Sequence, residues 1–415
     1  MSLFSSLHTG ASGLASSSLD LSVVGDNIAN ANTIGFKGSR VAFEEALAQS
    51  LMGAGGRGLG VNIQAVQRMI TQGALIQTGL ATDLALEGNG YFVVAGNHGG
   101  RDGTYYTRAG QFTVDNDGFL VNLDGLRVQG WTADAVGTIG GGLGDLPIAG
   151  TSSAPKPTNL ITIKANLQSD AEILGAWDPA SPRETSNFAS SVTVYDSLGI
   201  AHAVEVFYRR TGNGTWEWHA MADGGGLQGG TAGTATQVAS GTLEFDSDGV
   251  LINQTQASTF NPLGATAPQP LNFDMDAITQ FGNPSATSFL NQDGWAAGDL
   301  AAITIDQEGM VVGSFTNGKS RALGQIAVAN FSAPDQLERL GGNLLGSRAQ
   351  AGEATIGTAS SGGRASIVAG ALEQSNVDIA TEFIRMIEAQ RGFQANSKTV
   401  TTADQLLSDL ISLKR

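Results

Sequence analysis

The sequence predicts an α+β fold, in which long terminal α-helices pair as a coiled-coil-like stem and two mainly-β domains are inserted between them. Three observations lead to this prediction. An apolar residue recurs at every seventh position near the C-terminus, the same spacing recurs near the N-terminus, and short strand-like runs alternate with Gly-rich turns between these two regions. A seven-residue apolar repeat places a seam along one side of a helix, and such a seam packs against a partner helix.

The N-terminal helix is predicted over residues 1–30. Its apolar seam consists of Leu7, Leu14, Leu21 and Ile28. Because a matching seam exists at the other end of the chain, we expect the two ends to pair in one helical domain, from residues 1–30 and 372–415. Ordinary amphipathic helices that cover a single core are the alternative interpretation of both repeats.

A cluster of Asn, Thr and Gly ends the helix and begins a structured turn, and residues 40–75 follow it. Within this segment, the pattern over residues 41–47 predicts a short helix and the pattern over residues 61–66 predicts a strand. Residues 53–58 match the glycine spacing of a dinucleotide-binding loop. Such a loop follows a strand and opens a helix, so we expect an ordinary loop here.

Short strands and turns dominate the middle of the chain. Residues 91–94 and 203–208 are strand candidates, and residues 211–214 carry a strong hairpin signal. A run of Gly and Pro residues around 140–157 marks a domain boundary. A second mainly-β region follows it and ends near Asp299.

The C-terminal helix is predicted from Ser375 to Arg415. Ser375 can serve as the N-cap, with Asp378 three residues later as its acidic partner. Gly392 lies inside this helix, where Gly costs about 1 kcal/mol relative to Ala. We therefore expect the helix to be marginal in an isolated monomer and to form on packing. Its seam consists of Ile379, Met386, Phe393, Val400 and Leu407.

The charge and composition exclude several classes of function. The net charge is −16 without any basic cluster, which makes the chain a poor binder of nucleic acid and of anionic membrane surfaces. The absence of Cys excludes disulfides, thiolate metal sites and a Cys nucleophile. No window approaches the roughly 18 apolar residues of a spanning helix, so we expect no membrane insertion, and the N-terminus lacks the pattern of a secretory signal.

We expect no catalytic, cofactor-binding or metal-binding residues. The four histidines are not paired at metal-ligand spacing, and the chain contains neither a P-loop nor a G-x-S-x-G motif. Acidic turns at residues 115–118, 246–249 and 306–309 have two interpretations, a degenerate calcium loop or a hairpin turn. The lack of flanking helices favours the turn. The sequence does not decide whether two carboxylates form a glycosidase pair, because the members of such a pair come together only in the folded protein.

Four ordered blocks, at residues 27–37, 72–92, 106–121 and 395–407, carry a resemblance to a known family. The first block contains Asn27, Asn30, Asn32, Gly35 and Phe36. On these blocks the sequence resembles the flagellar rod and hook axial proteins. The resemblance implies that the five residues of the first block fix the turn into the linking segment, and that the seam residues of the two helices hold an assembly together.

The resemblance also implies a function that is structural rather than enzymatic. The chain would polymerise into the hook, a curved tube that acts as a universal joint and transmits torque from the rod to the filament. Residues 1–30 and 372–415 would form the inner helical domain, and residues 31–75 would form a linking segment. An inner β domain would comprise residues 76–150 and 300–362, and an outer β domain would comprise residues 155–298.

The partners that the resemblance implies are further copies of the chain in a helical homopolymer, the distal rod protein, the hook cap protein and the hook–filament junction protein. The location implied is extracellular, in the hook and basal body, after type III export without a cleaved signal peptide.

Two alternative functions remain open. Rod subunits of the same family are typically shorter and lack a large outer insertion, so the long insert favours the hook. A secreted β-rich binding protein or phage tail component is the second alternative. Trp216 and Trp218 would then form a glycan platform, although aromatic side chains on adjacent strands more often pack against their neighbours.

Overall fold

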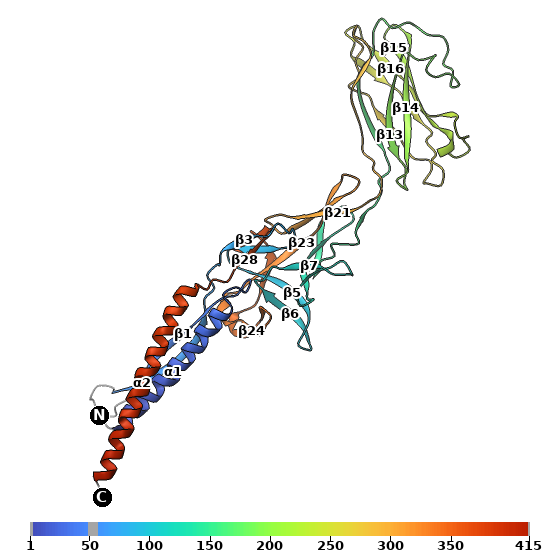
Figure 1. Ribbon diagram of the computed structural model, residues 1–415. Coiled ribbons are helices and arrows are strands. Elements are labelled where there is room, and N and C mark those ends of the chain that lie inside the picture. Colours follow the sequence, from blue (N-terminus) through green and yellow to red (C-terminus); the bar gives the residue numbers. More distant parts are fainter. Residues whose placement is uncertain (1–2, 49–56, 414–415) are drawn as a thin grey trace. The chain divides into compact units, whose positions relative to one another are not determined.

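The computed structural model describes residues 3–48 and 57–413. One helix lies near each end, and the described regular elements between them are strands and single-turn 3-10 helices (Figure 1). The predicted α+β class with a mainly-β middle is therefore confirmed. The predicted segments 1–30, 31–75 and 372–415 each include residues outside this description, as does most of the Gly-rich motif at 53–58.

The chain divides into two compact units. Unit 1 comprises Met1–Gly150, Ala302–Ser314 and Ser320–Arg415. Unit 2 comprises Thr151–Ala301 and Phe315–Lys319. Unit 2 is thus an insertion in the sequence of unit 1.

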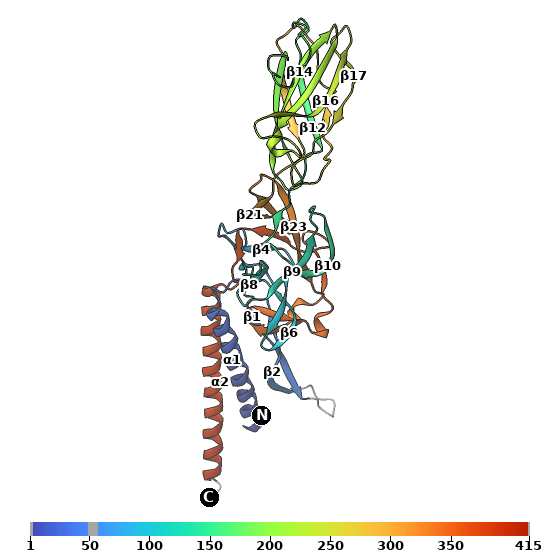
Figure 2. The same ribbon diagram turned by 90° about the vertical axis from the view of Figure 1, so that its right-hand side faces the viewer.

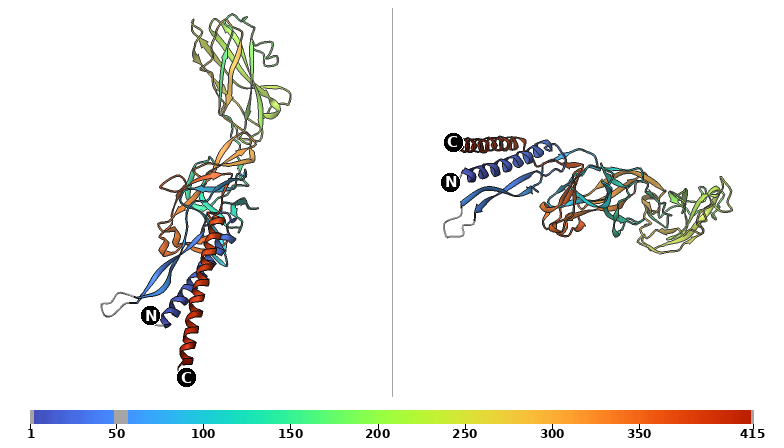
Figure 3. Two further views of the ribbon diagram at one scale, coloured as in Figure 1. Left: turned by 60° about the vertical axis from the view of Figure 1, so that its left-hand side comes forward. Right: turned by 90° about the horizontal axis from the view of Figure 1, so that it is seen from below.

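The helices of unit 1 are α1 (Leu3–Ala29) and α2 (Ile379–Leu413), which lie side by side (Figure 3). At the start of α2, Asp378 Oδ1 accepts a hydrogen bond from the Thr381 N–H at 2.7 Å. Asp378 is therefore the N-cap. The prediction of Ser375 as the cap is wrong, because Ser375 Oγ instead accepts the Val377 N–H ahead of the helix.

Strands β1 (Ser39–Ala48) and β2 (Arg57–Arg68) form an antiparallel pair in contact with α1 (Figure 2). The strand predicted over residues 61–66 is confirmed, and the helix predicted over residues 41–47 is wrong. Val41 pairs with Val66 and Phe43 pairs with Ile63. These cross-strand contacts outweigh the weak local preference for a helix.

The main sheet of unit 1 combines strands that precede and follow unit 2 in sequence. Its strands are β5 (Tyr91–His98), β6 (Arg101–Thr107), β7 (Phe112–Val114), β8 (Leu120–Asn122), β9 (Arg127–Ala133), β10 (Ile139–Asp145), β22 (Met310–Phe315), β23 (Ser320–Asn330), β24 (Glu338–Gly341), β25 (Leu344–Gly346) and β26 (Thr355–Thr358). The path runs β22-β23-β9-β5-β6-β25-β24. Gln325 pairs with Trp131, and Val328 pairs with Phe92. The two halves of unit 1 are therefore joined by backbone hydrogen bonds.

Two short strand pairs bring the residues before α2 against those after the linking segment. β4 (Leu84–Glu87) pairs with β27 (Ser366–Ala369), and β3 (Leu75–Gln77) pairs with β28 (Ala371–Glu373). Glu373 therefore lies at a junction between the linking segment, the main sheet and α2.

Unit 2 is built from two sheets that share one apolar core. The strands of these sheets are β12 (Leu160–Asn166), β13 (Phe188–Tyr195), β14 (Ala201–Gly212), β15 (Thr215–Asp223), β16 (Ala235–Phe245), β17 (Leu251–Gln254), β18 (Ala257–Ser258), β19 (Asn272–Asp274) and β20 (Ala286–Gln292). The strands β11 (Ser152–Ser153) and β21 (Gly298–Ile305) pair with each other and belong to neither sheet. The sheets are β13-β14-β15-β16-β17, with β18 beside β16, and β19-β12-β20 (Figure 2).

The core of unit 2 contains both tryptophans of the strand β15. Trp216 is 0% exposed and Trp218 is 1% exposed. Their ring faces pack inside the core, which excludes a surface platform for a glycan. The hairpin predicted at residues 211–214 is confirmed, because β14 and β15 pair around it.

Candidate assembly site

The helices α1 and α2 approach each other through small side chains. A Cβ added at Gly10 would lie 2.8 Å from Val400 Cγ2, and one added at Gly392 would lie 3.4 Å from Ser17 Oγ. The buried side chains on α2 include Glu382, Ala389 and Ala403, which belong to one seven-residue repeat. This repeat contains small or polar residues rather than large apolar ones, and small residues allow two helix backbones to come close.

The large apolar residues of the predicted seams are only partly covered in a single chain. Half-buried are Leu7, Leu14, Leu21, Ile28, Met386, Val400 and Leu407. Ile379 and Phe393 are 44% and 41% exposed. The nine side chains therefore do not form a closed core within one chain, and their packing between copies stays a prediction.

Further large apolar side chains of α2 are exposed. Phe383, Ile384 and Ile387 are 49%, 60% and 50% exposed, and Leu406 is 49% exposed. Ile379, Phe383 and Ile387 are spaced four residues apart, so they line one side of the helix. Monomeric proteins rarely leave such a group uncovered. The arrangement is suited to packing against other helices.

Asn27 connects the end of α1 to two other elements. Its Nδ2 donates to Ser39 O at 2.8 Å and to Glu382 Oε2 at 3.0 Å. Its Oδ1 accepts the Ser39 N–H at 2.9 Å. The side chain is 0% exposed, so the hydrogen bonds satisfy both ends of a buried amide. Asn27 thereby fixes α1 to β1 and to the first turn of α2.

The other residues of the first motif have different surroundings. Asn30 Nδ2 donates to Asp26 O at 2.9 Å, within the last turn of α1. Gly35 has a φ of +70°, and a Cβ there would lie 2.6 Å from the Ala109 N, so only glycine fits. Phe36 is buried. Asn32 is exposed and is not part of this buried turn.

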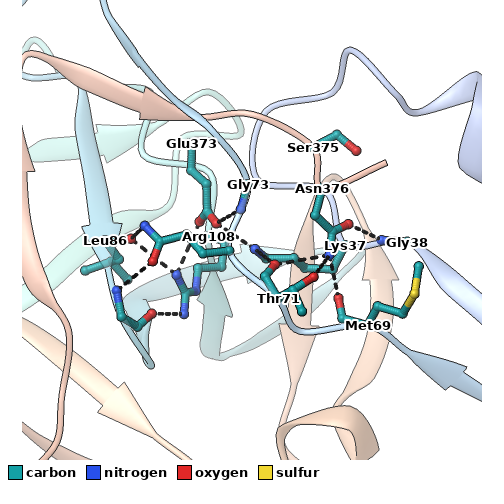
Figure 4. Close-up of polar contacts among 12 residues, drawn as sticks. Lys37, Gly38, Met69, Thr71, Gly73, Leu86, Arg108, Glu373, Ser375 and Asn376 are labelled. Atoms are coloured by element: carbon teal, nitrogen blue, oxygen red, sulfur yellow. Dashed lines mark hydrogen bonds and ion pairs between the residues drawn. The ribbon is translucent and has the colours of Figure 1, made fainter. Parts of the chain in front are cut away.

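Glu373 is the centre of a buried charge cluster in unit 1 (Figure 4). Its carboxylate pairs with Lys37 Nζ at 2.6 Å and with Arg108 Nη1 at 3.2 Å, and it accepts the Gly73 N–H at 2.9 Å. The Glu373 side chain is 0% exposed. Burying an ionised carboxylate is costly unless partners compensate it, and here two cations and an amide do so.

The two cations of this cluster also bind backbone carbonyls. Lys37 Nζ donates to Thr71 O at 2.8 Å, and Arg108 Nη2 donates to Gly88 O at 2.6 Å. Burial lowers the pKa of the Lys37 amine, and the hydrogen bond and charge of Glu373 oppose that shift. The cluster therefore fastens four separate chain segments to one carboxylate.

Asn376 completes the connection between the linking segment and α2 (Figure 4). Its Oδ1 accepts the Gly38 N–H at 2.9 Å, and its Nδ2 donates to Met69 O at 2.9 Å. Sequence reasoning missed Glu373 and Asn376 as functional residues. Lys37 and Arg108 lie inside recognised blocks, but no pattern in the sequence connects them to Glu373, and only their burial in the structure shows that an acidic partner is needed.

The acidic turns use their carboxylates to bind backbone amides. In each turn an Asp Oδ1 accepts a hydrogen bond at 2.8 Å from the backbone N–H four residues later. The pairs are Asp115 with Phe119, Asp246 with Val250 and Asp306 with Met310. The turn interpretation is therefore confirmed. The described residues include no group of three side chains that could hold a metal ion. Neither helix, as far as it is described, is long and apolar enough to cross a membrane.

Four family models match the chain in order. They are Flagella basal body rod protein over residues 7–37, Flagellar hook protein FlgE/F/G D1 domain over residues 85–171, Flagellar basal body protein FlaE D2 domain over residues 164–295, and Flagellar basal body rod FlgEFG protein C-terminal over residues 368–413. The first and last of these contain most of α1 and α2.

Similar proteins match nearly the full length. Flagellar hook protein FlgE of Borreliella burgdorferi is 35% identical over 455 residues, with 99% of each chain covered. Flagellar hook protein FlgE of Escherichia coli is 34% identical over 413 residues, with 97% of this chain and 98% of that protein covered. The crystal structure of Helicobacter pylori flagellar hook protein FlgE2 is 14% identical, with a TM-score of 0.49, and the match covers 70% of this chain and 98% of that one.

Proposed function

This chain belongs to the flagellar hook protein family, and from that premise we propose that it polymerises through its terminal helices into the hook. The polymer is a curved tube that acts as a universal joint and transmits torque from the rod to the filament. The observation that carries the proposal is the group of large apolar side chains that α2 leaves exposed in a single chain. The group consists of Ile379, Phe383, Ile384, Ile387, Phe393 and Leu406.

We infer that α1 and α2 form a coiled-coil-like stem, with small side chains between them and large ones on the outside. The close approach at Gly10 and Gly392 supports this pairing. The seam residues and the exposed side chains of α2 then pack between copies. Complete burial of a large apolar side chain contributes roughly 1.5–3 kcal/mol, so several half-exposed side chains supply enough free energy to drive association. Head-to-tail contacts of this kind generate open helical tubes.

The remaining segments have distinct roles in this proposal. Residues 31–75 link the stem to an inner β domain of residues 76–150 and 300–362, and residues 155–298 form an outer β domain. The region 151–299 has 15 acidic and 5 basic residues. Such an excess of one sign favours hydration and weak mutual contact, which suits an outer layer whose contacts change as a curved tube turns.

The same premise supports the partners and the location. Besides other copies of the chain, we propose contacts with the distal rod protein, the hook cap protein and the hook–filament junction protein. The subunit reaches the hook, outside the cell, by type III export without removal of a signal peptide. A purely structural role without enzymatic activity follows from membership of a family of hook subunits.

The test is negative-stain electron microscopy of the full-length protein and of a chain that lacks residues 1–30 and 375–415, both under polymerising conditions. We expect short curved tubes from the full-length protein and none from the truncated chain. Straight rods from the full-length protein would favour a rod subunit, and tubes from the truncated chain would contradict assembly through the terminal helices.

A double substitution and its control test whether the exposed apolar side chains of α2 drive assembly. Replacing Phe383 and Ile387 with Ser removes two half-exposed apolar side chains from α2 without cutting into a described core. We expect tube formation to require a much higher protein concentration. The control is Ile252→Ser in unit 2, where the side chain is 65% exposed. An equal loss of tubes in the control, or unchanged assembly of the α2 variant, would contradict the role of α2.

A further inference from the structure

A cavity of about 210 Å³ in unit 1 is lined by four cationic side chains and by no acidic one. The cationic residues are Lys37, Arg68, Arg108 and Arg339. Tyr91 and Phe36 contribute aromatic walls, and residues 341–345 close one side. In a chain whose net charge is −16, such a local concentration of positive charge requires a physical explanation.

Most of this charge has a partner outside the cavity wall. Glu373 pairs with Lys37 and Arg108, and Asp26 Oδ2 pairs with Arg339 Nη1 at 3.2 Å. Arg339 Nη2 also donates to the Lys37 carbonyl at 2.8 Å.

Arg68 is different. Its Nη2 donates to Leu337 O at 2.8 Å, while its Nε and Nη1 are buried and have no hydrogen-bond partner of good geometry in the described part of the chain. Arg108 Nε is also buried and without a partner. Two arginines that line one cavity therefore have, between them, three buried guanidinium nitrogens without an acceptor among the described residues. A buried donor of a charged group that lacks an acceptor costs more than one that is neutral.

The charge of Arg68 is not relieved by deprotonation. Burial lowers the pKa of its guanidinium, and the neighbouring charge of Arg339 lowers it further, but arginine stays protonated in proteins. Asp335 is the carboxylate whose charge opposes that shift. It lines an adjoining cavity, which Arg68, Arg339 and Glu338 also line, and it does not line this one. A negatively charged group in the cavity would remove both the unsatisfied hydrogen bonds and the mutual repulsion.

We propose that this cavity binds an oxyanion of the phosphate or carboxylate class, with Arg68 as its principal ligand and Arg108 Nε as a further donor. The planar fork of a guanidinium matches two oxygens of such an anion and forms strong charge-assisted hydrogen bonds with them. Since one water occupies about 30 Å³ of liquid, a cavity of about 210 Å³ has room for a phosphate-sized anion.

The oxyanion has two possible sources that share this chemistry. One is a free inorganic anion, and the other is a carboxylate side chain of a neighbouring copy. The site itself stands on the geometry of a single chain, whereas the second source rests on the proposed polymerisation. The experiment below separates the site from its source.

The first experiment titrates inorganic phosphate into the full-length monomer, with line broadening of the phosphorus NMR signal as the readout and with chloride at matched ionic strength. We expect saturable binding. Arg68→Gln should weaken it by about tenfold or more, because two charge-assisted hydrogen bonds are lost. Arg101→Gln, which removes an exposed charge of unit 1, should leave binding unchanged.

Arg68→Lys guards against a folding artefact. It keeps the positive charge and the apolar stem but loses the fork, so a folded Arg68→Lys variant with weakened binding supports the site. Absence of saturable binding in the parent protein, or equal binding in the parent, Arg68→Gln and Arg68→Lys proteins, would overturn the proposal.

The second experiment measures the rate of tube formation with and without saturating phosphate. Slower assembly in the parent protein, but not in Arg68→Gln, identifies a carboxylate of a neighbouring copy as the natural occupant. An unchanged rate identifies a free oxyanion. If the proposed polymerisation fails altogether, the phosphate titration of the monomer still decides whether the site exists.

Discussion

At the scale of single residues, Glu373 joins segments that lie far apart in the sequence. Lys37 is 336 residues and Arg108 is 265 residues from it. Because the carboxylate is inaccessible to water, its contribution to the stability of unit 1 depends on its pairing with both cations. Removing one partner of a buried ion pair destabilises a protein more than replacing the whole pair with apolar side chains.

Replacing Glu373 with Gln should lower the free energy of unfolding of unit 1 by about 3 kcal/mol, since two buried cations lose their counter-charge. The measurement is differential scanning calorimetry of the monomer. The matched control is Glu338→Gln, because Glu338 and Arg348 form a pair with side chains 43% and 53% exposed. Exposed pairs contribute little to stability because water and salt screen them, so similar losses in both variants would contradict a special role for Glu373.

A second residue-scale prediction concerns pH. The Thr381 backbone N–H, followed by the Thr381 hydroxyl, lowers the pKa of Asp378 below its ordinary value of 3.8. A carboxyl whose pKa is lower in the folded state stabilises the fold above its ordinary pKa, and that contribution is lost as the pH falls through the lowered value. The stability of the first turn of α2 should therefore be constant from pH 7 to about 5 and decrease below pH 3.8.

Hydrogen exchange of the Thr381 amide in the monomer measures this effect. Asp378→Asn keeps a capping oxygen without a titrating group, so its exchange should show less dependence on pH once the intrinsic rate is divided out. Asp378→Ala should exchange faster at every pH. A parent protein and an Asn variant with the same pH profile would exclude the carboxylate as the cause.

At the scale of elements, the close contact between α1 and α2 depends on glycine, which leaves room for the neighbouring helix. A methyl group at Gly10 would lie 2.8 Å from Val400, whereas one at Gly25 would meet nothing within 4 Å. Both positions lie in the same helix. They therefore separate helix propensity from packing between helices.

We expect Gly25→Ala to stabilise α1 by up to about 1 kcal/mol through helix propensity. Gly10→Ala should gain nothing or lose about 1 kcal/mol, because overpacking opposes the same gain. Urea unfolding followed by far-ultraviolet circular dichroism measures both. Adding Val400→Ala to Gly10→Ala makes room for the methyl group and should restore part of the loss, while an unchanged double variant would argue against this contact.

The elements also indicate what a sequence can reveal. Seven-residue spacing predicted both helices, yet the buried repeat of α2 contains Glu382, Ala389 and Ala403, which a search for large apolar residues passes over. The strand β1 was predicted as a helix because its pattern is locally ambiguous, and only its partner β2 decides the conformation. Asn27 and Gly35 were found through their motif, whereas Glu373 depends on partners that no local pattern connects to it.

At the scale of the whole molecule, the core of unit 2 and the helix α2 differ in whether large apolar side chains are buried. Unit 2 encloses Trp216, Trp218 and Phe260 almost entirely, whereas α2 of unit 1 leaves a row of large side chains uncovered. Segments with few buried apolar contacts open most readily. The terminal helices should therefore be the least stable part of a monomer.

Limited digestion of the monomer with a protease of broad specificity should remove the helices first and leave a resistant fragment that contains residues 151–301. Mass spectrometry of the fragments over time measures the order of cleavage. Protein assembled into tubes should lose this early cleavage, since the helices are then covered. Early cuts within β13 to β16 would contradict the expected order.

Glu373 follows both of its cations and the whole main segment of unit 2 in the sequence, which has a consequence for the order of synthesis. A ribosome delivers Lys37 and Arg108 long before their shared carboxylate emerges, so unit 1 remains electrostatically incomplete until Glu373 is made, whereas every residue of the main segment of unit 2 is already available. Lys37 on nascent chains arrested at residue 360 should react with an amine-specific reagent and become protected in the released protein. The buried charge cluster of unit 1 can therefore form only after the whole main segment of unit 2 has been synthesised.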